Sequence, residues 1–113
     1  MVMTLLVHPE HVLTLVTFAY SKAAIISMKA SLAAEWAIRG IRVNSISPGY
    51  MDIILNAGEG SIKEARETWA SRNPMGRMGA VGELDGMVVL LASRAGSYIN
   101  GADMVIDGGA VVF

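Results

Sequence analysis

The segment from Ala19 to Arg39 constrains the fold more than any other part of the sequence, because it contains neither glycine nor proline. Such a segment is typical of a long helix, and Gly40 directly after it suits the residue position that ends one. Its apolar residues do not keep to one stripe of the helix; they are Ala23, Ala24, Ile25, Ile26, Met28, Ala30, Leu32, Ala33, Ala34, Trp36, Ala37 and Ile38. We therefore expect burial on several sides, against a sheet on one and a second subunit on another.

The rest of the sequence alternates between strand-like and helix-like segments. Strands are expected from Ile41 to Ser47 and from Met104 to Asp107, and helices from Ser61 to Arg72 and from Glu83 to Ser93. The apolar run Val12 to Val16 is β-branched enough for a strand, although a buried helical turn also fits. This alternation predicts an α/β fold with two parallel strands, about three helices and right-handed crossovers. In the last helix, the residues expected to be buried are Leu84, Val88, Leu91 and Ala92.

The composition describes a small protein with little net charge. The 113 residues form one domain at most, and 53% of them are hydrophobic, more than so short a chain can bury in its own core. The formal net charge of -1, without a basic run, argues against nucleic acid as a partner. No apolar stretch approaches the roughly 20 residues that span a membrane. Without cysteine or an evident targeting segment, the chain fits a reducing compartment, and we expect a cytoplasmic protein.

Three blocks of the sequence occur in an order and at distances that resemble the C-terminal half of a short-chain dehydrogenase/reductase. They are Tyr20-Ser21-Lys22-Ala23-Ala24, Arg42-Val43-Asn44-Ser45-Ile46-Ser47-Pro48-Gly49 and Tyr98-Ile99-Asn100-Gly101-Ala102-Asp103-Met104-Val105-Ile106-Asp107-Gly108-Gly109. The resemblance implies the C-terminal portion of a three-layer, Rossmann-like domain that binds NAD(P). It covers residues 18–113, whereas residues 1–17 do not continue it. The sequence does not tell NADP from NAD, because the residue that discriminates between them lies in the other half of the family's domain.

The resemblance also implies the roles of the residues around Lys22. In the family, a tyrosine four residues before this lysine is the general acid/base, and the lysine lowers the pKa of the phenol and binds the nicotinamide ribose. Phe18 stands at that position and has no hydroxyl. Tyr20 is the nearest phenol, but two residues of helix turn it about 200° away from Lys22. Tyr20 reaches the ammonium only if the helix begins after it. Lys22 and Tyr20 are therefore the candidate catalytic residues.

A second set of candidate residues follows the expected strand at 41–47. In the family, the backbone after the Pro-Gly pair contacts the nicotinamide, which makes Pro48, Gly49 and Met51, together with Lys22, the candidate cofactor-binding residues. A strand-ending turn without a cofactor explains Pro48 and Gly49 equally well. The family often has a threonine four residues after this glycine, and here that position is Ile53.

Two further patterns in the sequence do not amount to ligand sites. Gly76, Gly79 and Gly82 are spaced as in a phosphate-binding loop, but no strand–helix–strand unit surrounds them. His8 and His11 have the i, i+3 spacing of a ligand pair, but they lie beside a proline and have no third ligand. We expect no metal site.

The resemblance implies an NAD(P)-dependent oxidoreductase that interconverts a secondary alcohol or polyol and a ketone. The blocks Tyr50-Met51-Asp52 and Ile99-Asn100-Gly101-Ala102-Asp103 are similar to fungal-type reductases of mannitol, arabinitol and sorbose. Because the phenol and the nucleotide-binding half are missing, we expect a truncated chain that is inactive alone. The alternative is a non-enzymatic fragment that acts as an interaction module. In either case we expect a homo-oligomer formed through the Ala19–Arg39 helix and the C-terminal strand.

Overall fold

The computed structural model describes residues 12–53 and 61–112. The segment 1–11, including His8 and His11, lies outside these residues. The elements are, in chain order, α1 (Val12–Trp36), η1 (Ala37–Arg39), β1 (Ser45–Pro48), β2 (Met51–Asp52), α2 (Ser61–Arg72), β3 (Gly79–Ala80), η3 (Val81–Leu84), α3 (Asp85–Ala92), η4 (Arg94–Gly96), β4 (Asp103–Ile106) and η5 (Ala110–Val112), where η marks a 3₁₀ helix.

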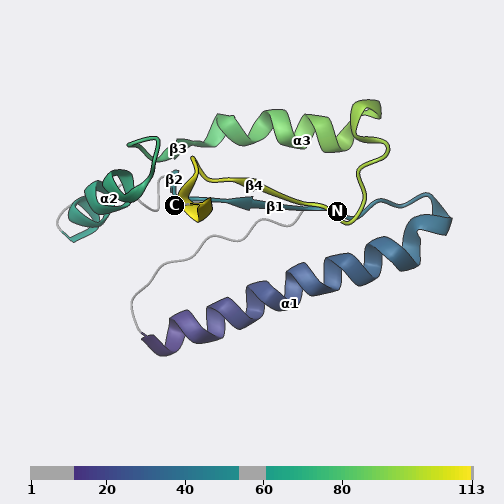
Figure 1. The fold of residues 1–113 in the computed structure, drawn as a ribbon, viewed down its shortest axis with the longest axis horizontal. Coiled ribbons are helices and arrows are strands. Elements are labelled where there is room, and N and C mark those ends of the chain that lie inside the picture. Colours follow the sequence, from purple (N-terminus) through teal and green to yellow (C-terminus); the bar gives the residue numbers. More distant parts are fainter. Residues whose placement is uncertain (1–11, 54–60, 113) are drawn as a thin grey trace.

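These elements form three layers, with α1 on one face of the β1–β4 pair and α3 on the other (Figure 1). A second pair, β2 with β3, lies with α2 beyond the end of β1. Both pairs are parallel. The expected α/β class, with three α-helices and parallel strands, is confirmed. The described residues contain four strands rather than the expected two, because β2 and β3 each contribute only two residues and leave no periodic pattern in the sequence.

Helix α1 begins earlier than expected and already includes Val12 to Val16. The strand interpretation of this run is therefore wrong. No glycine or proline separates the run from the alanine-rich segment after it, and adding residues to an existing helix is easier than starting a separate element. The other end agrees with the sequence, since Gly40 has a φ of 71° and donates a hydrogen bond to the carbonyl oxygen of Ala37.

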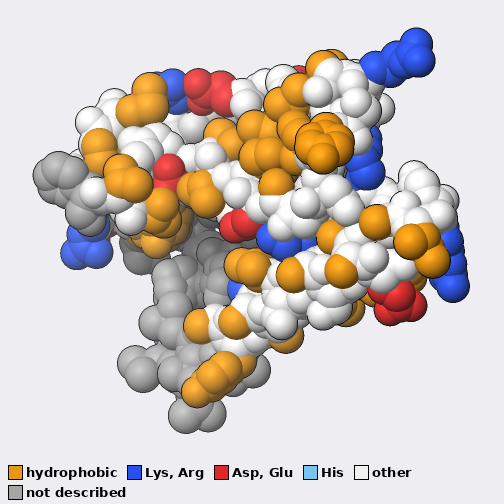
Figure 2. Space-filling model, turned by 45° about the vertical axis from the view of Figure 1, so that its right-hand side comes forward, with side chains coloured by type: hydrophobic (Ala, Val, Ile, Leu, Met, Phe, Trp, Pro, Cys, Tyr) orange, Lys and Arg blue, Asp and Glu red, His pale blue; other side chains and the backbone are white. Residues whose placement is uncertain are grey.

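Burial along α1 is confined to one face, which corrects the expectation of burial on several sides. The opposite face is open, with Tyr20 72% and Met28 45% exposed. Figure 2 shows hydrophobic side chains spread along α1 and gathered over the α3 layer. Within residues 12–53 and 61–112, no element covers these side chains. The less exposed residues of α1 recur every three or four positions and are Lys22, Ile25, Lys29, Leu32, Ala33 and Trp36.

Strand β1 pairs with β4 in a register that places Ser45 opposite Asp103. The strand begins four residues later than the sequence predicts, because Val43 and Asn44 bond to residues 99–102, which precede β4, and not to β4 itself. The Val43 N–H donates to Asn100 Oδ1 at 2.9 Å, and Asn44 Nδ2 donates to the Ile99 carbonyl at 2.9 Å. These amide contacts hold the chain in place just before the strand begins.

Helix α2 is attached to β2 at two points. The rings of Tyr50 and Trp69 are stacked, with centroids 4.7 Å apart and planes at 6°. Arg66 Nη2 lies 2.8 Å from Asp52 Oδ1 in an ion pair. Trp69 is 9% exposed and anchors the helix.

Helix α3 buries less than its sequence predicts. Of the four residues expected to be buried, Leu91 is buried and Leu84 is half-buried, but Val88 is 41% exposed and Ala92 is exposed. The neighbouring Val89 is 65% exposed. The reason is the same as for α1, since no other element of the described part of the chain packs on the outer face. No helix within the described ranges is long and apolar enough to cross a bilayer.

Candidate functional site

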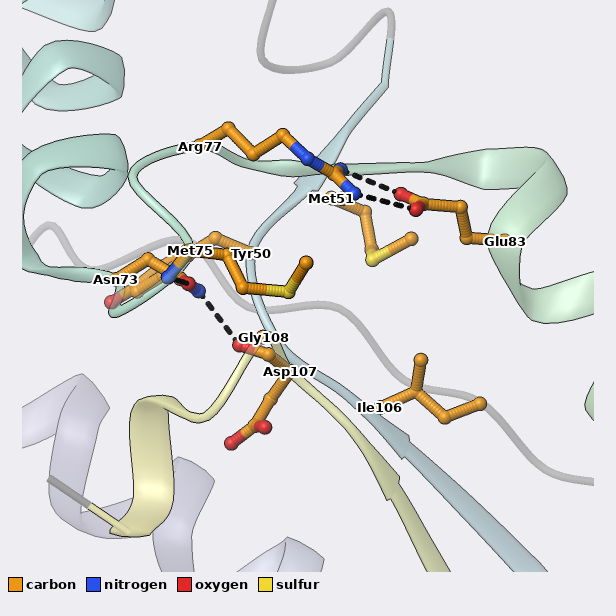
Figure 3. Close-up of a pocket in the computed structure, with 10 residues that line it drawn as sticks. Tyr50, Met51, Asn73, Met75, Arg77, Glu83, Ile106, Asp107 and Gly108 are labelled. Atoms are coloured by element: carbon orange, nitrogen blue, oxygen red, sulfur yellow. Dashed lines mark hydrogen bonds and ion pairs between the residues drawn. The ribbon is translucent and has the colours of Figure 1, made fainter.

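A cavity of about 90 Å³ lies at the carboxyl ends of β1 and β4 (Figure 3). Ligands of open α/β sheets bind at this end of the strands. The cavity is closed by the chain that leaves β1, by the turn after α2 and by the chain that leaves β4. Its lining residues are Tyr50, Met51, Asn73, Met75, Arg77, Gly79, Glu83, Ile106, Asp107 and Gly108.

Asn73 joins the end of α2 to the end of β4. Its Nδ2 donates to the Asp107 carbonyl at 2.7 Å, and its Oδ1 accepts the Met75 N–H at 2.9 Å. Asn73 is 8% exposed, so these bonds are partly shielded from water. A Cβ on Gly108 would lie 2.5 Å from Asn73 Oδ1, which explains the glycine there. The contact fixes one wall of the cavity.

The Asp107 carboxylate accepts two hydrogen bonds from backbone N–H groups of its own turn. Oδ1 accepts the Gly109 N–H and Oδ2 accepts the Val111 N–H, both at 2.9 Å. In Figure 3 this carboxylate points away from Ile106, which lies on the other face of β4. Asp107 therefore has a structural explanation that requires no ligand.

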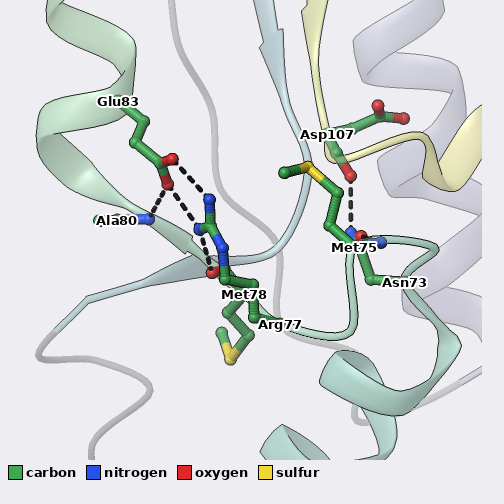
Figure 4. A network of polar contacts seen from close by, with 7 residues as sticks. All are labelled: Asn73, Met75, Arg77, Met78, Ala80, Glu83 and Asp107. Atoms are coloured by element: carbon green, nitrogen blue, oxygen red, sulfur yellow. Dashed lines mark hydrogen bonds and ion pairs between the residues drawn. The ribbon is translucent and has the colours of Figure 1, made fainter.

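Arg77 and Glu83 form a second polar contact in the wall (Figure 4). The guanidinium donates to both carboxylate oxygens, at 2.8 and 2.7 Å, and Glu83 also accepts the Ala80 N–H at 2.7 Å. These bonds lower the pKa of Glu83 to about 2 and raise the pKa of Arg77. Glu83 thereby supports the start of η3.

Two glycines near the cavity are closely packed, and packing against backbone atoms requires the one at position 49. A Cβ on Gly49 would lie 2.8 Å from Asp107 Cα and Cβ, closer than real side chains approach. A Cβ on Gly79 would lie 2.8 Å from Met51 Sδ. Strand-end packing accounts for Gly49 even without a cofactor.

Lys22 lies on the sheet-facing side of α1 and is half-buried, and burial lowers the pKa of its ammonium. Tyr20 lies inside α1 and is 72% exposed. The alternative in which the helix begins after Tyr20 is therefore wrong, and the two side chains point to different sides of the helix. The backbone of Phe18 belongs to α1 as well.

The structure brings together only some of the residues expected to bind a cofactor. Pro48 ends β1, Gly49 follows it, and Met51, 3% exposed, starts β2 and lines the cavity. Lys22 is not among the lining residues. Within the described ranges, no group of three His, Cys, Asp or Glu residues could hold a metal ion.

Sequence reasoning missed Asn73, Arg77 and Glu83 as lining residues. The contact of Asn73 with Asp107 spans 34 residues and leaves no local pattern in the sequence. Arg77 and Glu83 are opposite charges six residues apart across a glycine-rich turn, a spacing that does not correspond to a helix face. The only feature of the sequence that could have predicted the Arg77–Glu83 contact is the opposite charge of two residues that flank a turn.

The family model described as Enoyl-(Acyl carrier protein) reductase matches residues 3–111. The chain belongs to the short-chain dehydrogenase/reductase family. The match includes most of residues 1–17, which the sequence analysis had left outside the resemblance.

Relatives of this short-chain dehydrogenase/reductase chain include enzymes named for polyols. Galactitol 2-dehydrogenase (L-tagatose-forming) of Cereibacter sphaeroides is 40% identical over 97 residues, which is 86% of this chain and 38% of the relative. NADP-dependent mannitol dehydrogenase of Hypocrea jecorina is 47% identical over 93 residues, 82% of this chain and 34% of the relative. The chain therefore spans little more than a third of the length of these relatives.

A solved structure agrees with the Rossmann-like fold. A short-chain type dehydrogenase/reductase from Mycobacterium marinum superposes with a TM-score of 0.73 at 43% identity. The match covers 80% of this chain and 35% of that one. A putative gluconate dehydrogenase from Agrobacterium tumefaciens has a TM-score of 0.76 at 35% identity, covering 83% and 37%.

Proposed function

We propose that this chain provides the lysine-bearing helix and the strand-end loop of an NAD(P)-dependent oxidoreductase that interconverts a secondary alcohol or polyol and a ketone. The observation that carries the proposal is the position of Lys22. It lies half-buried on the sheet-facing side of α1, in a chain of the short-chain dehydrogenase/reductase family. The polyol names of the matched relatives support the substrate class.

The residues present fit a nicotinamide dinucleotide at Lys22. A half-buried ammonium with a lowered pKa donates hydrogen bonds from a partly desolvated position, where such bonds to ribose hydroxyls are stronger than in water. The dinucleotide, when bound, supplies or accepts the hydride. Pro48 and Gly49 direct the polypeptide along the carboxyl end of β1, where their backbone can border the nicotinamide ring. Gly49 by itself adds little support, because its packing against Asp107 already requires glycine.

Proton transfer is the step that these residues do not provide. Phe18, four residues before Lys22, has no hydroxyl, and Tyr20 is directed to another side of the helix. We expect the 113-residue chain to have no dehydrogenase turnover with either NADH or NADPH.

The test combines turnover with dinucleotide binding by the 113-residue chain. NADPH and NADH fluorescence titrations compare the unaltered chain with Lys22→Ala and with Lys63→Ala, a control that removes an exposed lysine from α2. Loss of a hydrogen bond from a charged donor weakens binding about tenfold or more. We expect this for Lys22→Ala alone. Equal affinities for all three chains would refute the role of Lys22, and ketone-dependent NAD(P)H oxidation by the unaltered chain would refute the expected inactivity.

A second candidate function is an interaction module. The outer faces of α1 and α3 carry exposed hydrophobic side chains, among them Tyr20, Met28 and Val89. This surface favours self-association through α1. Sedimentation velocity of the unaltered chain and of Met28→Lys tests it. The unaltered chain should sediment as an oligomer and the variant as a smaller species, and a monomer at all concentrations would exclude this function.

A further inference from the structure

The cavity at the ends of β1 and β4 is walled mainly by apolar groups. Met51, Met75 and Ile106 contribute thioether and aliphatic surface, and Tyr50 contributes its ring. Methionine side chains are flexible and polarizable, so they adapt to the shape of an apolar ligand.

The charged and amide groups in the same wall already have partners inside the protein. Asn73 uses both ends of its amide, one on the Asp107 carbonyl and the other on the Met75 N–H. Arg77 and Glu83 neutralise each other through two hydrogen bonds. A ligand hydroxyl would have to compete with these bonds for its hydrogen-bond partners.

The volume limits the group that can enter. An engineered apolar cavity of about 150 Å³ holds benzene, so a volume of about 90 Å³ is in proportion to three or four carbon atoms.

We propose that this cavity binds a short alkyl group of about three to four carbon atoms. The inference rests on the proposed function only in assigning that alkyl group to one end of the carbonyl substrate. It narrows the proposed substrate class at that one end, because an alkyl group fits this wall better than a carbon chain with a hydroxyl on every carbon.

The test uses the 113-residue chain labelled with ¹³C in its methionine methyl groups. Signals of Met51 and Met75 are assigned with Met51→Leu and Met75→Leu, and Met28, exposed on α1, is the internal control. The probes are 1-butanol and the four-carbon polyol erythritol. We expect 1-butanol to shift the Met51 and Met75 signals, and erythritol to leave them unchanged. No nicotinamide is present, so failure of this test is separate from failure of the proposed function.

Chain length provides a second measurement. Each methylene moved from water into an apolar cavity is worth about 0.8 kcal/mol, or about fourfold in affinity. The apparent affinity should therefore rise about fourfold per carbon from ethanol to 1-butanol and stop rising once the cavity is full.

Gly79→Ala provides a variant that blocks the cavity. The added methyl would lie 2.8 Å from Met51 Sδ, at the flexible end of that side chain, and should push the thioether into the cavity. Gly86→Ala, where nothing lies within 4 Å, is the matched control. We expect Gly79→Ala to remove the response to 1-butanol at Met75, and Gly86→Ala to keep it. The proposal is overturned if erythritol shifts both signals as strongly as 1-butanol, if neither probe shifts them, or if Gly79→Ala responds like the unaltered chain.

Discussion

Substituting Gly49 with alanine separates the packing role of this glycine from its expected role beside a cofactor. Gly49 follows β1, and its N–H donates to the Ile106 carbonyl at 2.9 Å. An added Cβ would lie 2.8 Å from Asp107 Cα and Cβ and 3.2 Å from its carbonyl oxygen. Two of these three atoms belong to the backbone, so a side-chain rotation cannot relieve the clash.

The size of the effect follows from these contacts. Forcing one methyl group into a packed region destabilises a protein by about 1–3 kcal/mol. Weakening the hydrogen bond from Gly49 to Ile106 adds about 1 kcal/mol. We expect Gly49→Ala to lower the free energy of unfolding by about 2–4 kcal/mol. Each kcal/mol corresponds to roughly 4–8 °C in a small domain, so the melting temperature should fall by at least roughly 8 °C.

Thermal and urea unfolding followed by circular dichroism measure this change without any cofactor. Gly86→Ala is the matched control, because Gly86 lies in α3 with open space around it. Alanine in a helix is favoured over glycine by about 0.5–1 kcal/mol, so this control should unfold at a higher temperature. Equal unfolding midpoints for Gly49→Ala and the unaltered chain would refute the packing argument and leave cofactor approach as the reason for the glycine.

Three further perturbations test other contacts. Asn73→Ala removes two hydrogen bonds and should lower the free energy of unfolding by about 2 kcal/mol in urea, whereas Ser71→Ala, an exposed control on α2, should change it little. Because the pKa of Glu83 in the folded chain is about 2, against an ordinary 4.5, its pairing stabilises the fold above pH 4.5. This contribution is lost as the pH falls toward 2, so the urea midpoint of Glu83→Gln should depend less on pH in that window. Trp69→Ala removes the ring stacked on Tyr50 and should accelerate tryptic cleavage within α2, while Trp69→Phe should restore resistance; equal cleavage rates would show that the stack does not hold the helix.

The sequence correctly predicted the ends of helices that depend on the residues directly beside them. Gly40 ends the first helix because glycine tolerates a φ of 71°, and α2 ends at Arg72 because Asn73-Pro74 follows it. Both strands of the central pair were expected, apart from the start of β1. That start depends on Asn100, which accepts the Val43 N–H from 57 residues away.

The remaining features depend on contacts between distant residues or on the absence of a covering element. The apolar run Val12 to Val16 has no hydrophobic period that distinguishes a strand from a helix. It is helical because it is continuous with the rest of α1. Val88 was expected to be buried and is exposed, since none of the elements that the structure describes packs on that face of α3. Met51 was predicted as a site residue because it follows Pro48 and Gly49. The cavity that it lines also requires Asn73 and the turn after α2.

The pairing of β1 with β4 has a consequence for how the polypeptide folds during synthesis. Ser45 faces Asp103, so every rung of the central ladder closes a loop of 58 residues. Contacts so distant along the chain form slowly, because closing the loop lowers the entropy of the chain before any stabilising hydrogen bond has formed. A ribosome must release the chain at least as far as Ile106 before the whole ladder can form. Until then β1 has an unpaired edge, and a nascent chain in this state is most exposed to aggregation and to chaperones.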